Sequence, residues 1–202
     1  MNKVGERFSS GNGVGKDYSK AFEWFQRAAV KEDKNTLFSY GMCFYQGRGV
    51  AKNEAKAVEL WEKAAKKGHL AAMHNLGACY DKGTGVAQNV AKAFQWFKLA
   101  AERGFAESMY TLGVFYKNGK GTMKDDAQAF EWYKRAAEKG NAKALAFLGQ
   151  CLSDGKITEG DDAQAFKWYK SAAERGYALA MYHLGLCFAK GTGVTKDKKQ
   201  AF

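Results

Sequence analysis

Apolar and polar positions along residues 70–105 follow the periodicity of two successive amphipathic helices. In the first, the apolar positions keep the i, i+3, i+4, i+7 spacing of one buried helix face, and they are Leu70, Met73, Leu76, Gly77 and Tyr80. A short Gly-Thr-Gly-Val turn follows at 83–86. A second apolar face then consists of Ala93, Phe94, Phe97, Ala100 and Ala101. The pattern predicts a helix-turn-helix unit, whose helices are called helix A and helix B below.

The same unit recurs along the chain with a period of 36 residues and without insertion or deletion. The Leu76-Gly77 pair of helix A has counterparts at Val4-Gly5, Tyr40-Gly41, Leu112-Gly113, Leu148-Gly149 and Leu184-Gly185. A fixed period of this size indicates a solenoid, in which each repeat contacts its neighbours. We therefore predict an all-α fold and a single array over residues 1–202. Its units are a partial one at 1–33, full ones at 34–69, 70–105, 106–141 and 142–177, and a partial one at 178–202 whose second helix has just begun.

Glycine and Asp or Asn residues mark the predicted helix ends in every unit. Glycine at the end of helix A is suited to the left-handed conformation that stops a helix, and it recurs as Gly11, Gly47, Gly83, Gly119, Gly155 and Gly191. Helix B begins after a residue that can cap free backbone amides, namely Asp17, Asn53, Asn89, Asp125, Asp161 and Asp197. Gly68, Gly104, Gly140 and Gly176 end helix B. Glu32 occupies that place in the first unit, so we expect helix B of that unit to end less tightly.

The composition is consistent with an array that has a continuous core, because 46% of the 202 residues are apolar and there is no proline. The four cysteines share one repeat position: Cys43, Cys79, Cys151 and Cys187. Equivalent positions on stacked helices lie about 8–10 Å apart, beyond the roughly 7 Å limit between the Cα atoms of a disulfide. We expect these cysteines to be buried and unpaired, as in a reducing compartment.

The first ten residues, MNKVGERFSS, lack the apolar run of a signal peptide. No stretch of the sequence approaches the roughly 18 consecutive apolar residues of a membrane span. Together with the unpaired cysteines, these features predict a cytoplasmic protein.

The formal net charge of +11 raises nucleic acid as a possible partner. The basic residues, however, are spread over all units and interleaved with acidic ones, and most aromatic residues occupy core positions. This distribution disfavours nucleic-acid binding, for which affinity that falls steeply with salt would be required.

No catalytic residue, cofactor site or metal site is predicted. Asp125-Asp126 and Asp161-Asp162 resemble paired carboxylates, but the first of each pair is a helix cap. Residues 11–16, GNGVGK, lack the spacing of a phosphate-binding loop. The histidines and cysteines lack the spacing of zinc ligands. A catalytic pair should interrupt the repeat, and no such interruption exists.

The recurring motif A-x-A-x-x-x-LG-x-x-Y-x-x-G-x-GV-x-x-D-x-x-KA-x-x-W-(F/Y)-x-x-AA-x-x-G resembles the Sel1-like repeat (SLR), a longer-looped relative of the tetratricopeptide repeat. The resemblance covers essentially all 202 residues. It implies an α/α right-handed superhelical solenoid that acts as a non-enzymatic scaffold or adaptor for partner proteins. Members of the family occur in bacterial signalling and host interaction and in eukaryotic quality control, so a bacterial source is consistent with the sequence.

One branch of that family, the cysteine-rich secreted bacterial proteins, has been linked to penicillin binding and β-lactamase activity. Its hallmark is a disulfide that joins the end of helix B to the next helix A. The corresponding positions in this chain include Ala65 and Ala101 on helix B and Ala72 and Ser108 on helix A. The hallmark is absent, which disfavours this activity; hydrolysis of nitrocefin would reveal it.

In tetratricopeptide-like arrays helix A lines the concave surface, so its variable positions are expected to set specificity. By that resemblance we predict a groove for a peptide or a partner protein, formed by Phe38, Met42, Tyr45, His74, Asp81, Tyr110, Lys117 and Tyr182. The alternative for Tyr110 and Tyr182 is packing between adjacent A helices. Neither end has a polar capping repeat, so apolar surface is expected at 1–10 and 178–202, through which the chain would stack end to end or continue into a longer array.

Overall fold

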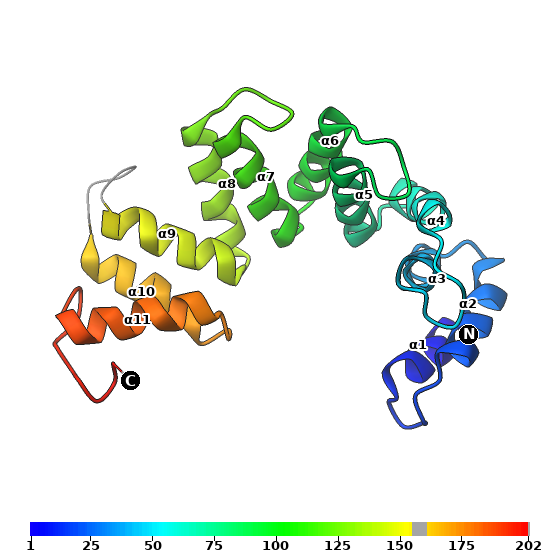
Figure 1. The fold of residues 1–202 in the computed structure, drawn as a ribbon, viewed down its shortest axis with the longest axis horizontal. Coiled ribbons are helices and arrows are strands. Elements are labelled where there is room, and N and C mark those ends of the chain that lie inside the picture. The colour runs from blue at the N-terminus through cyan, green and yellow to red at the C-terminus, as the bar shows by residue number, and fades with distance from the viewer. Residues whose placement is uncertain (155–160, 202) are drawn as a thin grey trace. The chain divides into compact units, whose positions relative to one another are not determined.

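A computed structural model describes residues 1–154 and 161–201 of the chain, without the side chain of Asp154. Eleven helices and no strands form in these residues, which confirms the predicted all-α repeat fold (Figure 1). The helices are α1 (Asn2–Ser10), α2 (Tyr18–Ala29), α3 (Lys34–Gln46), α4 (Glu54–Lys66), α5 (Leu70–Lys82), α6 (Val90–Glu102), α7 (Ala106–Asn118), α8 (Asp126–Glu138), α9 (Ala142–Asp154), α10 (Asp162–Ala173) and α11 (Ala178–Lys190).

Contacts group the helices into two compact units, Met1–Arg103 and Gly104–Phe202. Within each unit, helix A packs against helix B of its own repeat, as α3 does against α4 and α9 against α10. Helix B also packs against the next helix A, as α2 does against α3 and α10 against α11. The continuous array predicted over residues 1–202 stays a prediction.

Each hydrophobic core is therefore built from three helices of two successive repeats. In the first unit, Ala21 and Phe25 of α2 and Cys43 of α3 form one buried cluster. The same three positions 144 residues later, Ala165, Tyr169 and Cys187, form another. All four cysteines are buried and free, as predicted.

The predicted caps form at the start of helix B. The side chains of the capping residues accept hydrogen bonds of 2.8–3.0 Å from the backbone N–H three residues later, and these residues are Asp17, Asn53, Asn89, Asp125 and Asp161. Asp197 accepts from the backbone of Lys199 and Gln200. Residues 198–201 form a turn at the place where the last helix B is predicted to begin, and that helix stays a prediction.

The glycines that end helix A adopt the predicted left-handed conformation, with φ between 63° and 80° at Gly11, Gly47, Gly83, Gly119 and Gly191. Gly155, the sixth predicted stop, lies outside the described residues, as do Ile157 and Thr158 of the same turn. The turn predicted from the sequence is therefore present wherever the structure describes it.

In three of the turns the second glycine lies against the preceding repeat. A Cβ atom on Gly49 would overlap the backbone of Tyr18 in α2, and one on Gly85 would overlap that of Glu54 in α4. Gly193 has the same relation to Asp162 in α10. The turn therefore closes over the first residues of the previous helix B, and only glycine permits this approach.

Glu32 has a φ of 49°, the one positive value recorded for a residue other than glycine in the described chain. Glu32 adopts the left-handed conformation of the glycines at the equivalent positions, but α2 ends one residue earlier in the repeat than α4 and α8 do, and the expectation of a less tight helix end stays a prediction. Its carboxylate lies 3.3 Å from the Lys67 ammonium in an exposed ion pair. Exposed ion pairs contribute little to the free energy of unfolding. This pair therefore does not offset the strain of the left-handed backbone at Glu32.

Glu32→Gly should therefore raise the free energy of unfolding by about 1 kcal/mol, since the left-handed conformation costs a side-chain-bearing residue about 1–2 kcal/mol. Urea-induced unfolding measured by circular dichroism would check this. Glu32→Ala is the matched control, because it removes the ion pair but keeps the strain. Equal stability of the Gly and Ala variants would contradict the explanation.

Candidate partner-binding surface on helix A

Three of the predicted groove residues pack against the helix B of their own repeat. The rings of Phe38 and Trp61 lie 6.2 Å apart, those of His74 and Phe97 5.2 Å, and those of Tyr110 and Tyr133 5.5 Å. Phe38 also stacks on His69 with ring centroids 4.3 Å apart. Phe38, His74 and Tyr110 are half-buried and contribute to packing within the repeat.

Met42 and Tyr45 lie together, as predicted, and line a hollow of about 150 Å³ between α3, α4 and α5. The floor of this hollow includes Trp61, whose ring lies 5.1 Å from that of Tyr45. Asn75 donates a hydrogen bond of 3.7 Å to the sulfur of Met42 from the far wall. We call this the second hollow, because a larger hollow, described next, lies earlier in the chain.

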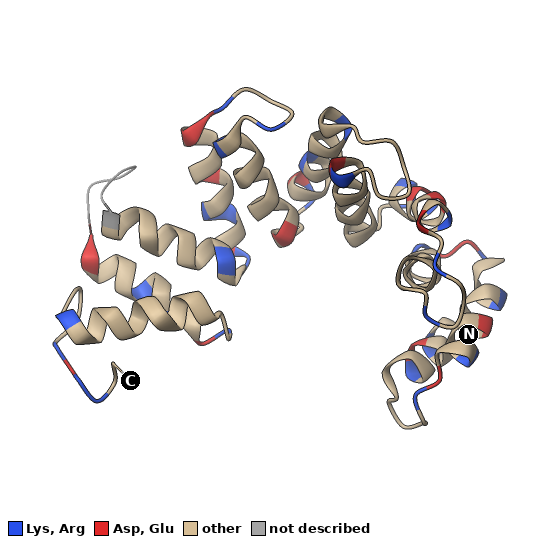
Figure 2. Cartoon of the chain, viewed as in Figure 1, with Lys and Arg blue, Asp and Glu red and all other residues tan. Residues whose placement is uncertain are grey.

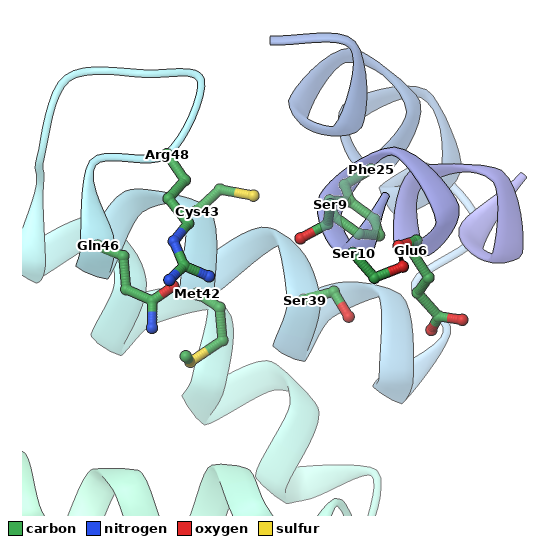
Figure 3. Close-up of a pocket in the computed structure, with 9 residues that line it drawn as sticks. All are labelled: Glu6, Ser9, Ser10, Phe25, Ser39, Met42, Cys43, Gln46 and Arg48. Atoms are coloured by element: carbon green, nitrogen blue, oxygen red, sulfur yellow. Dashed lines mark hydrogen bonds between the residues drawn. The ribbon is translucent and has the colours of Figure 1, made fainter. Parts of the chain in front are cut away.

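A larger hollow of about 480 Å³ lies between α1, α2 and α3 and is called the first hollow (Figure 3). Its lining comprises Glu6, Ser9, Ser10, Phe25, Ser39, Met42, Cys43, Gln46 and Arg48. Figure 3 shows Arg48 and Gln46 on one side, with Glu6, Ser9 and Ser10 of α1 on the opposite side. Phe25 and Cys43 are buried residues of the core beneath.

A third hollow of about 190 Å³ lies between α9, α10 and α11. It is lined by Gln150, Ser153, Tyr169, His183, Leu186, Cys187, Lys190 and Thr192. The imidazole of His183 stacks on the Tyr169 ring, with centroids 4.8 Å apart and planes 13° apart.

The three hollows occupy the same positions of the repeat. The six residues that line the second hollow lie 36 residues after six that line the first, and the eight of the third lie 144 residues after eight of the first. Each hollow lies where helix A, the aromatic residue of helix B and the next helix A meet. The repeat therefore produces a site of one geometry whose lining changes from copy to copy.

The size of the side chains at two of these positions explains why the first hollow is larger than the second. Ser9 and Ser39 leave the first hollow wide, whereas Tyr45 and Asn75 occupy the equivalent positions in the second. One copy is filled by Phe147, which stands at the position of Ser39 and whose ring lies 4.1 Å from that of Tyr133.

The remaining predicted residues have different surroundings. The Lys117 ammonium lies 4.6 Å from the centre of the Phe147 ring, at the filled copy of the hollow. Asp81 is half-buried, and its backbone carbonyl accepts a hydrogen bond of 2.7 Å from Gln88. Tyr182 is 62% exposed, together with its neighbours Leu179 and Met181, so the apolar surface expected on the last helix is present.

Several polar and charged residues of the hollows were not predicted from the sequence, notably Glu6, Ser9, Ser39, Arg48 and Lys190. The repeat register contained part of the signal, because Ser9 and Glu6 share positions with Tyr45 and Met42. Arg48 was missed because it is the central residue of a turn, which we had assigned only a structural role.

Burial raises the pKa of the Cys43 and Cys79 thiols to about 11. Both thiols therefore remain protonated at neutral pH and are poor nucleophiles. In residues 1–154 and 161–201 no group of three His, Cys, Asp or Glu side chains could hold a metal ion.

Basic and acidic residues are scattered over the helices and turns of both units (Figure 2). None of the helices in the described ranges is both long enough and apolar enough to span a membrane. The cytoplasmic location stays a prediction.

The family model for the Sel1 repeat matches the chain six times, at residues 1–29, 36–69, 70–105, 106–141, 142–177 and 178–202. The chain belongs to the Sel1 repeat family. Proteins of this family generally serve as protein-interaction modules and bind protein partners, and most are non-enzymatic scaffolds. The resemblance inferred from the recurring motif is thereby confirmed.

Two solved structures are similar to this Sel1 repeat protein at above 30% identity. A Sel1 repeat protein from Oxalobacter formigenes is 36% identical with a TM-score of 0.94, and the match covers 100% of this chain and 82% of that one. The protective antigen c5321 of uropathogenic Escherichia coli, which displays an SLR fold, is 37% identical with a TM-score of 0.86. That match covers 98% of this chain but only 43% of the antigen. No curated protein matched the chain.

The cysteine rich protein B of Helicobacter pylori shares the fold, with 23% identity and a TM-score of 0.53 over 68% of this chain and 98% of that one. Ala65 and Ala72 of the present Sel1 repeat protein, which stand at the disulfide positions of the cysteine-rich branch, are 2% and 0% exposed. They serve here as small core residues between helices.

Proposed function

We propose that this Sel1 repeat protein is a non-enzymatic scaffold that binds a peptide segment of a partner protein along helix A. The observation that carries the proposal is the recurrence of one hollow at the same repeat positions, with a different lining in each copy. A packing requirement would keep these positions alike, as it does for the buried alanines Ala64, Ala100, Ala136 and Ala172. Accessible positions that keep the same geometry in each repeat but carry different side chains are typical of a recognition surface.

The first two hollows share Met42, which lines both. A single segment that crosses Met42 can therefore enter the wide first hollow and the narrow second one. Aromatic residues at the centre of an interface often provide most of the binding energy. We therefore expect Tyr45 to contribute more to partner binding than Phe38, which already stacks on His69.

Site-specific photo-cross-linking in the native cell tests this proposal. A photoreactive phenylalanine derivative at Tyr45 should give a covalent adduct with a partner protein, because Tyr45 lines the second hollow. The matched control is the same amino acid at Gln95, an exposed position on helix B in the same unit. Adducts at Gln95 with none at Tyr45 would place the partner on helix B and overturn the proposal.

A further inference from the structure

The first hollow contains hydrogen-bond donors that have no partner among the residues that the structure describes. The Arg48 guanidinium makes one recorded side-chain contact, with the face of the Tyr18 ring at 5.0 Å. No carboxylate pairs with it in residues 1–154 and 161–201, and the side chains of Ser9, Ser39 and Gln46 have no recorded hydrogen bond there. These donors are therefore available to a bound group.

The third hollow repeats this chemistry with different residues. Its cation is Lys190, which stands at the position of Gln46 and has no ion pair within the described ranges. Ser153 is equivalent to Ser9, and Gln150 supplies an amide. Two copies of one site, 144 residues apart, thus each combine a cation with a serine and an amide.

The second hollow lacks a cation and is lined by Met42, Tyr45, Trp61, Asn75, Ala78 and Cys79. A cation in the lining therefore does not follow from the repeat itself but belongs to individual copies. Both polar hollows also have an apolar floor, Phe25 with Cys43 in the first and Tyr169 with Cys187 in the third.

Glu6 is the one acidic side chain in the lining of the first hollow. Its Oε1 accepts a hydrogen bond of 2.8 Å from Asn2, and it lies opposite Arg48 (Figure 3). At the equivalent position the third hollow has the neutral Gln150. Glu6 is thus expected to weaken the binding of an anionic group without preventing it.

Resting on the function proposed above, we propose that the partner segment is an acidic peptide and that the first hollow binds one of its Asp or Glu side chains. Arg48 would pair with the carboxylate, since a guanidinium presents several donors in a plane that matches a carboxylate. Ser9, Ser39 and Gln46 would donate further hydrogen bonds. The formal net charge of +11 favours the approach of such a segment.

The test is the fluorescence anisotropy of a short fluorescein-labelled peptide of alternating glutamate and leucine with an amidated C-terminus. We expect the full chain to bind it more tightly than the peptide in which glutamine replaces glutamate. Arg48→Gln should weaken binding about tenfold, because it removes charge-assisted hydrogen bonds. Glu6→Gln should strengthen binding about twofold by removing a repulsive charge.

Two further variants separate the hollow from the general charge. Ser39→Phe should abolish binding by filling the hollow, as Phe147 does at the equivalent position of the same fold. Arg27→Gln is the matched control, because Arg27 is an exposed arginine on helix B, stacked over Trp24. It should leave the affinity unchanged, and circular dichroism should confirm that all variants are folded.

Equal binding of the glutamate and glutamine peptides would overturn the carboxylate preference. If Arg27→Gln lost as much affinity as Arg48→Gln, the carboxylate site would also be overturned, because the peptide would then be attracted by the general positive charge of the chain. A single-stranded DNA probe that binds in the same Arg48-dependent way would assign the surface to nucleic acid. A cross-link at Tyr45 alongside any of these results would leave the scaffold function standing and remove only the acidic partner.

Discussion

Gly85→Ala should lower the free energy of unfolding by about 2–5 kcal/mol. The estimate adds about 1–2 kcal/mol for a left-handed alanine to about 1–3 kcal/mol for overpacking. The φ of Gly85 is +69°, and a methyl group there would overlap the backbone of Glu54 and lie 2.8 Å from the Ala55 nitrogen. Backbone atoms cannot rotate away as a side chain can, so the turn would have to lift off α4. Urea-induced unfolding would measure the loss.

Gly68→Ala is the control for this experiment, because Gly68 has a similar φ of +84° but only the end of the Arg103 side chain within 4.0 Å. It should cost about 1–2 kcal/mol, the conformational part alone. Equal losses for the two variants would show that contact between the turn and the preceding helix B contributes nothing, which would contradict the packing described for Gly49, Gly85 and Gly193.

Trp61→Ala should destabilise the protein by about 3–5 kcal/mol, the usual cost of truncating a buried tryptophan. Trp61 is 1% exposed and contacts the rings of Phe38 and Tyr45. Its indole N–H donates a hydrogen bond of 3.2 Å to the Phe38 carbonyl. The substitution would therefore leave a cavity under the second hollow, which calorimetric or urea-induced unfolding would register.

Trp61→Phe is the conservative companion, because phenylalanine fills the equivalent positions Phe25 and Phe97. We expect it to cost about 1–2 kcal/mol, through the lost hydrogen bond and the smaller ring. A loss as large as that of Trp61→Ala would indicate that the indole hydrogen bond, rather than the buried volume, stabilises this repeat.

Much of the fold could be predicted from the sequence because its determinants are local and repeated. A cap such as Asn89 acts on the backbone three residues away, and a stop such as Gly83 acts on its own helix. Because the cap and the glycine stop each recur six times, the 36-residue period is clear from the sequence. The left-handed conformation of Glu32 could not be predicted, because residues with a side chain rarely adopt it.

The binding surface was only partly predictable, because each hollow is formed by three helices from two successive repeats. The variable positions of helix A include Met42 and Tyr45, which line the second hollow, but the sequence alone did not distinguish an open hollow from a filled one. That difference depends on side chains 30 residues apart, such as Ser9 with Ser39, or Lys117 with Phe147. The stacking of Phe38 on His69 could not be predicted from the sequence either, because it is a tertiary contact.

Within each unit a core is completed by the helix A that follows it, and Gly49, Gly85 and Gly193 contact the helix B that precedes them, so a repeat packs against its neighbours in sequence. In-frame duplication or loss of one 36-residue segment would preserve both contacts at the new junction. A gene of this kind can thus lengthen or shorten its recognition surface by recombination, one hollow at a time. The order of side chains in the hollows can then evolve separately from the structure that holds them.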